Sequence, residues 1–146
     1  MPVSRTGGGL EARLAPSQLE LLRRATEAFD VLVPDPQERR FVLGEGGAGL
    51  VALFAVEHDP NHSLSLSATE PQLRAAHALL TTLLAMVPSE RAFMERVGFF
   101  RENAAGVALG LRRGVGAATP AEPDASDTSD TSARSDASAG SREPGE

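Results

Sequence analysis

The stretch Ser63–Val87, SLSLSATEPQLRAAHALLTTLLAMV, changes from the period of a β-strand to the period of a helix. Serine alternates with leucine over Ser63–Ser67, which predicts a strand with one face toward solvent. Thr69 and Gln72 then match a capping box, and apolar residues recur every three or four positions as far as Val87. This pattern predicts a long packed helix over Thr69–Val87 and places the chain in the α+β class.

Two shorter segments with helical periodicity lie on either side of this stretch. Pro16, Ser17 and Glu20 predict the start of an N-terminal helix that ends near Asp30. Downstream, the Pro88-Ser89 pair stops the long helix and caps a short one over Glu90–Val97, which Gly98 ends.

Two apolar runs between the N-terminal and long helices predict the remaining strands. Phe41–Leu43 is short, and Leu50–Val56 is a seven-residue apolar run that would be buried on both faces of a sheet. With Ser63–Ser67 they predict a three-stranded antiparallel β-meander in which Leu50–Val56 is central. A further C-terminal strand is expected over Val107–Leu111, because Gly106 and Gly110 would each weaken a helix there.

The two ends of the chain differ in composition from its middle. Residues 1–15 carry a run of three glycines and are expected to form a flexible lead, followed by a single domain over residues 16–113. Residues 114–146 are rich in Asp, Ser and Ala, and are expected to form a disordered acidic tail. Of the net charge of −6, the residues from Val115 onward contribute −5, because they hold seven acidic residues and two arginines.

The composition excludes several classes of chemistry. All 14 basic residues are arginine, and the chain contains no cysteine. Schiff-base chemistry, a P-loop lysine, a thiol nucleophile and a thiolate metal site are therefore absent. The domain has no basic excess, so we expect no nucleic-acid partner. The preference for Arg over Lys, with abundant Ala and Gly, indicates the coding bias of a GC-rich bacterial genome.

The sequence carries no signal for secretion or membrane insertion. Its first residues lack the continuous apolar run of a signal peptide, and the apolar-rich stretch Ala75–Val87 is too short to span a bilayer. We therefore expect a soluble, cytoplasmic protein without a membrane partner.

The segment Gly44–Val51, GEGGAGLV, matches the pattern G-x-G-x-x-G-x-V. With the apolar runs before and after it, the segment resembles the glycine-rich loop of the protein kinases, which covers nucleotide phosphates. The lysine that a kinase requires on the next strand does not exist in this chain. The interpretation from sequence is a glycine-rich hairpin.

A longer segment resembles the acetyltransferase superfamily that uses acetyl-coenzyme A. The resemblance rests on SLSLSAT, on the helix start Gln72–His77, and on RAFMERVGF at Arg91–Phe99. It implies that Gln72, Arg74 and His77 belong to a loop that holds the coenzyme pyrophosphate at a helix N-terminus. Ala75 and His77 stand where that family has glycines, and Met94 stands where it has a tyrosine.

His58 and His62 are the candidate metal ligands, with Asp59 and Glu57 beside them. The Asp-Pro-Asn sequence between the two histidines is itself typical of a surface turn. A turn leaves the directions of the imidazole rings unspecified, so both interpretations stay open.

Phe99 and Phe100 are the candidate interaction residues. Two adjacent aromatic rings rarely both point into one small core, so one of them is expected on a surface that contacts a partner or a second copy. We predict from sequence a non-catalytic regulatory or assembly module that acts through protein contacts, with no cofactor and no catalytic residue. The alternative is a degenerate acetyltransferase-like protein that binds acyl-coenzyme A.

Overall fold

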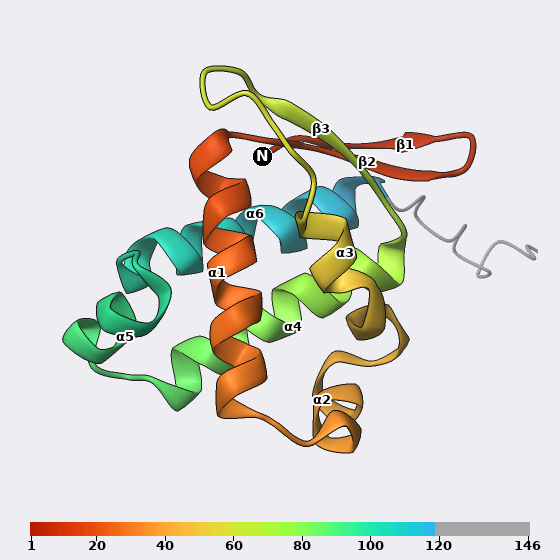
Figure 1. Ribbon diagram of the computed structural model, residues 1–146. Helices are drawn as coiled ribbons and strands as arrows, with labels where there is room; N and C mark the ends of the chain where they lie inside the picture. Colours follow the sequence, from red (N-terminus) through yellow and green to blue (C-terminus); the bar gives the residue numbers. More distant parts are fainter. Residues whose placement is uncertain (119–146) are drawn as a thin grey trace, which may run out of the picture.

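The computed structural model describes residues 1–118 and confirms the α+β class (Figure 1). Over these residues a three-stranded antiparallel sheet combines with six α-helices and one 3-10 helix. In chain order the elements are β1 (Val3–Thr6), β2 (Gly9–Leu14), α1 (Pro16–Leu32), α2 (Pro36–Leu43), η1 (Glu45–Gly49), α3 (Leu50–Phe54), β3 (Leu64–Ala68), α4 (Glu70–Met86), α5 (Glu90–Val97) and α6 (Arg101–Ala118).

The sheet has the order β1-β2-β3, and its apolar face packs on the helices (Figure 1). Leu10, Ala12 and Leu14 alternate along β2 and are buried, and β3 adds Leu66 and Ala68 to the same core. Ala12 lies opposite Leu66, and Leu10 lies opposite Ala68. The strand predicted over Ser63–Ser67 is therefore confirmed, with its serines exposed.

The other two strands differ from the prediction, because they come from residues 1–15. The expected flexible lead instead forms the β1–β2 hairpin, and Gly7 and Gly8 make the turn between its strands. A two-residue glycine turn is a common hairpin connection. Interpreting the glycines as a source of flexibility missed the period-two alternation that follows them in β2.

The strands predicted over Phe41–Leu43 and Leu50–Val56 are wrong, because both segments are helical. Asp35 caps α2 by accepting a hydrogen bond from the Gln37 N–H at 2.9 Å, and Pro36 occupies the first turn. In α3 the run buries only one stripe, formed by Leu50 and Phe54 four residues apart. Val51 is 59% exposed, so the run is not buried on two faces.

The C-terminal strand predicted over Val107–Leu111 is also wrong, because these residues belong to α6. The helix forms despite the low helix propensity of its glycines, and one of them, Gly114, leaves space for Val3 of β1. A Cβ at Gly110 would lie 3.5 Å from Met1, and a Cβ at Gly114 would lie 2.4 Å from Val3 Cγ2.

Helix α6 also crosses the predicted domain boundary at Gly114. It continues to Ala118 and buries Val115 in the core. Composition missed this last turn because a single valine supplies its apolar contact. The rest of the predicted tail, residues 119–146, lies outside the described residues.

The three predicted helices are confirmed as α1, α4 and α5. Thr69 and Gln72 form the expected capping box at the start of α4, and Gly98 ends α5 with a φ of 77°. Helix α1 differs at its first residue, because Ala15 rather than Ser17 is the cap, and the Ala15 N–H donates to Gln18 Oε1. None of the helices in residues 1–118 is both long enough and apolar enough to cross a membrane.

Candidate functional site

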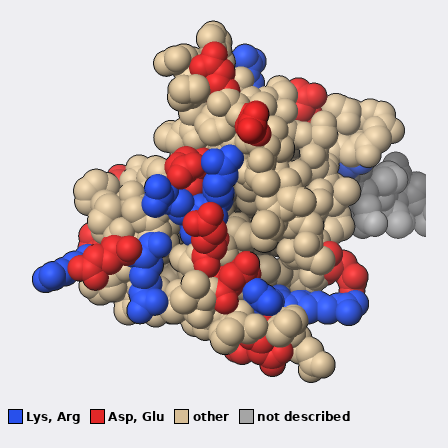
Figure 2. All heavy atoms as spheres, viewed as in Figure 1, with Lys and Arg blue, Asp and Glu red and all other residues tan. Residues whose placement is uncertain are grey.

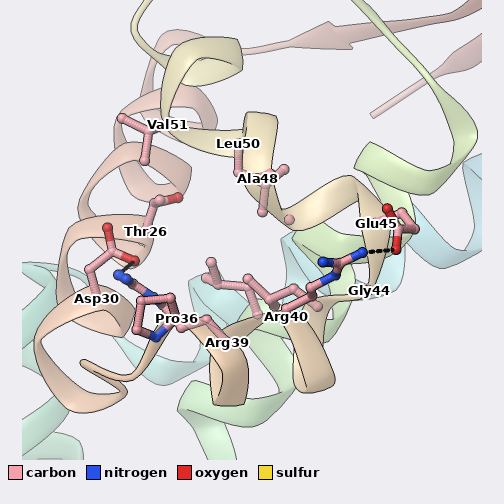
Figure 3. A pocket seen from close by; sticks show the side chains of 13 residues that line it. Thr26, Asp30, Pro36, Arg39, Arg40, Gly44, Glu45, Ala48, Leu50 and Val51 are labelled. Carbon is pink, nitrogen blue, oxygen red and sulfur yellow. Dashed lines mark hydrogen bonds and ion pairs between the residues drawn. The ribbon is translucent and has the colours of Figure 1, made fainter.

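A groove of about 510 Å³ opens between α1, α2, η1 and α3 (Figure 3). Its floor is apolar and is formed by Leu43 of α2, Leu50 of α3 and Leu79 of α4. Leu50 and Leu79 are buried in the core, whereas Leu43 is partly exposed. The volume lies within the range of roughly 300–1,000 Å³ that is typical of ligand sites.

Two ion pairs border the groove and join α2 to its neighbours. Asp30 Oδ1 accepts from Arg39 Nη1 at 2.8 Å, which links α1 to α2. Arg40 Nη2 donates to Glu45 Oε1 at 2.8 Å, which links α2 to η1 (Figure 3). This bond from Arg40, with its positive charge, holds the pKa of Glu45 below its ordinary value. Exposed ion pairs contribute little net stability. Their main effect here is to orient α2 relative to α1 and η1.

Helix α2 is the α-helix in residues 1–118 that has no buried residue. Val42 and Leu43 pack against the core but stay partly exposed. Pro36 begins the helix, and Gly44 follows it with a φ of 68°, which is a conformation that favours glycine. One wall of the groove is therefore held by few apolar contacts and belongs to the weakly anchored part of the fold.

The glycines of residues 44–49 bring η1 against the start of α4. A Cβ at Gly46 would lie 2.0 Å from the Pro71 carbonyl oxygen, and one at Gly49 would lie 2.9 Å from Gln72 Nε2. The segment is a 3-10 helix between two α-helices, so the predicted glycine-rich hairpin is wrong. Close packing on α4 accounts for Gly46 and Gly49 of the kinase-like pattern, and the φ of 68° accounts for Gly44.

A second hollow of about 280 Å³ continues the groove along α1. The two hollows share Thr26, Asp30 and Val51. Their α1 residues extend from Arg23 to Asp30, which is roughly 10 Å along a helix axis. Arg23 fixes this end of the groove, because its guanidinium donates to the backbone carbonyls of Phe54 and Val56, each at 3.1 Å.

Apart from Glu27, the polar side chains that line the two hollows have hydrogen-bond or ion-pair partners. The Thr26 hydroxyl donates to the Leu22 carbonyl at 2.8 Å, and the charged residues of the rim pair with one another. Among the described residues, every buried side-chain nitrogen and oxygen has a hydrogen-bond partner. The surface view shows side chains of both signs gathered over α1 and α2, next to a largely uncharged area (Figure 2). This arrangement favours apolar binding over proton transfer.

The candidate coenzyme residues Gln72, Arg74 and His77 all lie in α4, and the side chains of Gln72 and Arg74 are hydrogen-bonded within its first turns. Gln72 completes the capping box, and Arg74 Nη2 donates to Glu70 Oε1 at 2.6 Å. His77 is partly buried, and its carbonyl accepts from Thr81 Oγ1. The helix start beside them is covered by η1, and all strand pairs in residues 1–118 are antiparallel.

His58 and His62 lie on the exposed loop between α3 and β3. Asp59 organises this turn by accepting from the Asn61 N–H at 2.9 Å and contacting His62 Nδ1 at 2.7 Å. The backbone bond from Asn61 is the main cause that lowers the pKa of Asp59, and the bond to His62 adds to it. No group of three or more His, Asp or Glu side chains in residues 1–118 is placed to hold a metal ion.

Phe99 and Phe100 separate at the start of α6. Phe99 is partly buried against the core, whereas Phe100 is 59% exposed. The Phe100 carbonyl accepts from the Asn103 N–H at 3.0 Å and so begins the helix. One ring therefore faces solvent, and its role in an interaction remains a prediction.

Comparison of the chain with protein-family models, with curated proteins and with solved structures found no match. Function must therefore be inferred from the groove and its contacts.

Sequence reasoning missed the groove because it missed α2. The signal was present, since Asp35 followed by Pro36 matches a helix cap and a first helical position. The pairing of Asp30 with Arg39 had no such signal, because the two residues belong to different helices.

Proposed function

We propose that this protein is a non-catalytic binding module that acts through protein contacts, and that the groove along α1 receives its partner. The observation that carries the proposal is the apolar floor of the groove, extended by the 59% exposed side chain of Val51. Contiguous exposed apolar surface is typical of a surface that a partner covers, and Val51 extends the apolar floor of the groove toward solvent.

The groove best suits the apolar face of an amphipathic helix. Its length along α1 corresponds to about two helical turns, and helices commonly bind in such grooves through residues three and four apart. The acidic and basic groups of the rim would face the charged flanks of this helix. Because these rim groups and the Thr26 hydroxyl are already hydrogen-bonded, they support a role in recognition rather than in chemistry.

The test compares the partners captured by three forms of the full chain. Val51→Asp places a charge in the groove, and Leu109→Asp is the matched control, because Leu109 is 37% exposed on α6 away from the groove. Each form is immobilised on a support and exposed to a lysate of the cells in which the protein naturally occurs. The captured proteins are then quantified by mass spectrometry. The strongest captured protein is then purified and titrated against each form.

We expect one partner that the unmodified and Leu109→Asp forms bind with equal affinity. Val51→Asp should bind it at least about tenfold more weakly, which is roughly 1.4 kcal/mol. Equal binding to Val51→Asp would place the contact elsewhere, and the absence of any partner for all three forms would contradict the proposal. Thermal unfolding of each variant shows that it is folded.

A further inference from the structure

The outer edge of β3 is a second candidate binding surface, because it presents backbone N–H and C=O groups that point away from the sheet. The Arg13 N–H donates to the Pro2 carbonyl at 2.9 Å, so the peptide groups of Arg13 point toward β1. Peptide directions alternate along a strand, so those of Ala12 point toward β3, where Ala12 lies opposite Leu66. In β3 the peptide groups of Leu66 therefore face β2, and those of Ser65 and Ser67 face away from the sheet.

No described residue is hydrogen-bonded to this outer edge. Within residues 1–118, no hydrogen bond from outside the strand pair reaches the N–H or C=O groups of Ser65 or Ser67. Strand β3 is also the last strand in the order β1-β2-β3. Four strand-type backbone groups are thus presented together, two from each serine, and such an edge is a template for another strand.

The two edges of the sheet are protected differently. At the β1 edge, Pro2 precedes the strand, Arg5 Nε donates to the Ala118 carbonyl, and α6 packs against Val3. The β3 edge has none of these features, because residues 63–69, SLSLSAT, contain neither a proline nor a charged residue. Charges, prolines and covering helices are the usual means by which proteins block strand pairing.

We propose that β3 pairs in antiparallel fashion with β3 of a second copy of this chain, about a two-fold axis at Leu66. Full overlap of the strands then places Ser65 opposite Ser67 of the second copy, and Leu64 opposite Ala68. The Ser65–Ser67 pair occurs twice, and each occurrence exchanges two N–H···O=C bonds. Two three-stranded sheets thereby become one six-stranded sheet.

The strand matches itself better than it would match an arbitrary peptide. Under the two-fold axis, serines face serines on the exposed face, and Leu66 faces Leu66 on the apolar face. Residues 64–68 contain no charged side chain, so no like charges face each other across the two copies. This inference rests on the sheet edge alone and does not depend on the groove.

The test uses two double variants that differ only in the charge at one position. Ser65→Lys with Ser67→Lys sets lysine opposite lysine at both cross-copy pairs, which disfavours the dimer. Ser65→Lys with Ser67→Glu sets lysine opposite glutamate in the proposed register, which favours it. Both serines are exposed, so the monomer should fold in every case. Ser4→Lys with Thr6→Lys is the matched control, because these exposed residues lie on the β1 edge strand.

Sedimentation equilibrium at micromolar concentrations measures the dimerisation constant of each full-length form. We expect a dimer for the unmodified protein, for the lysine–glutamate variant and for the β1 control. For the double-lysine variant we expect a dimer dissociation constant that is at least about tenfold higher. A monomeric unmodified protein would overturn the proposal and leave the edge to a strand of another protein. A double-lysine variant that dimerises as tightly as the unmodified chain would also overturn it, as would a lysine–glutamate variant that dimerises no better than the double-lysine variant.

Discussion

Gly46 contacts Pro71 so closely that a Cβ on Gly46 would lie 2.0 Å from the Pro71 carbonyl oxygen. This contact fixes η1 on the first turn of α4, and with it the position of Leu50 in the floor of the groove. The shape of the candidate site therefore depends on the lack of a side chain at one position.

Gly46→Ala should destabilise the protein by about 1–3 kcal/mol, because the atoms it would meet belong to the backbone and cannot turn aside. Gly49→Ala is the matched control, since its Cβ would meet only the amide end of the Gln72 side chain. Urea denaturation monitored by circular dichroism measures both variants. Equal midpoints for the two variants would show that η1 can shift away from α4.

Gly114→Ala and Gly106→Ala should change stability in opposite directions, although both substitutions raise the helix propensity of α6. At Gly114 the Cβ would lie 2.4 Å from Val3 Cγ2, whereas nothing lies within 4 Å at Gly106. We expect Gly106→Ala to add up to about 1 kcal/mol and Gly114→Ala to lower the unfolding midpoint. In the double variant, Val3→Ala should recover part of the loss at Gly114, and additive effects would argue against the contact.

A chain that ends at Gly114 should be less stable than one that ends at Ala118. The shorter chain loses the buried side chain of Val115 and the Ala118 carbonyl that accepts from Arg5 Nε at 3.0 Å. Burial of a valine side chain contributes about 1.5–3 kcal/mol. Calorimetric melting of the two truncated forms isolates the last turn of α6, and identical melting temperatures would mean that this turn does not contribute.

Acid should loosen α2 before the rest of the fold. The pKa of Glu45 is lowered by Arg40, so this ion pair contributes fully above the ordinary glutamate pKa of about 4.3. The contribution is lost as the pH falls below that value toward the lowered pKa of the folded state. Hydrogen exchange of the α2 amides, corrected for the intrinsic effect of pH, should therefore rise in this range. Glu45→Gln should show faster exchange already at neutral pH, and an unchanged rate would show that the Arg40–Glu45 ion pair does not hold α2 in place.

Local sequence signals predicted the elements whose caps and periodicity agree. Thr69 and Gln72 cap α4 as expected, and Gly98 ends α5. The alternating serines and leucines of β3 also predicted its exposed and buried faces correctly. In these segments, the residues that start or stop an element are close in sequence to those that pack.

The prediction was wrong in segments whose secondary structure depends on contacts between residues that are distant in the sequence. Gly114 weakens a helix in isolation, but it makes room for Val3, which is more than 100 residues away in the sequence. The run Leu50–Val56 fits either a strand or a helix, and the contact of Gly46 with Pro71 places its first residue on α4. The groove could not be predicted for the same reason, because its floor combines Leu43, Leu50 and Leu79 from three helices.

The bond from Arg5 to the Ala118 carbonyl joins the first strand of the described chain to its last helix. Of the described elements the β1–β2 hairpin is synthesised first, and β3 and α6, which it contacts, follow later in the chain. The hairpin therefore lacks its partners β3 and α6 until the chain has been made as far as Ala118. Apolar surface that is exposed on an unfinished chain favours association, so the order of synthesis makes the hairpin the part of this domain that most benefits from protection.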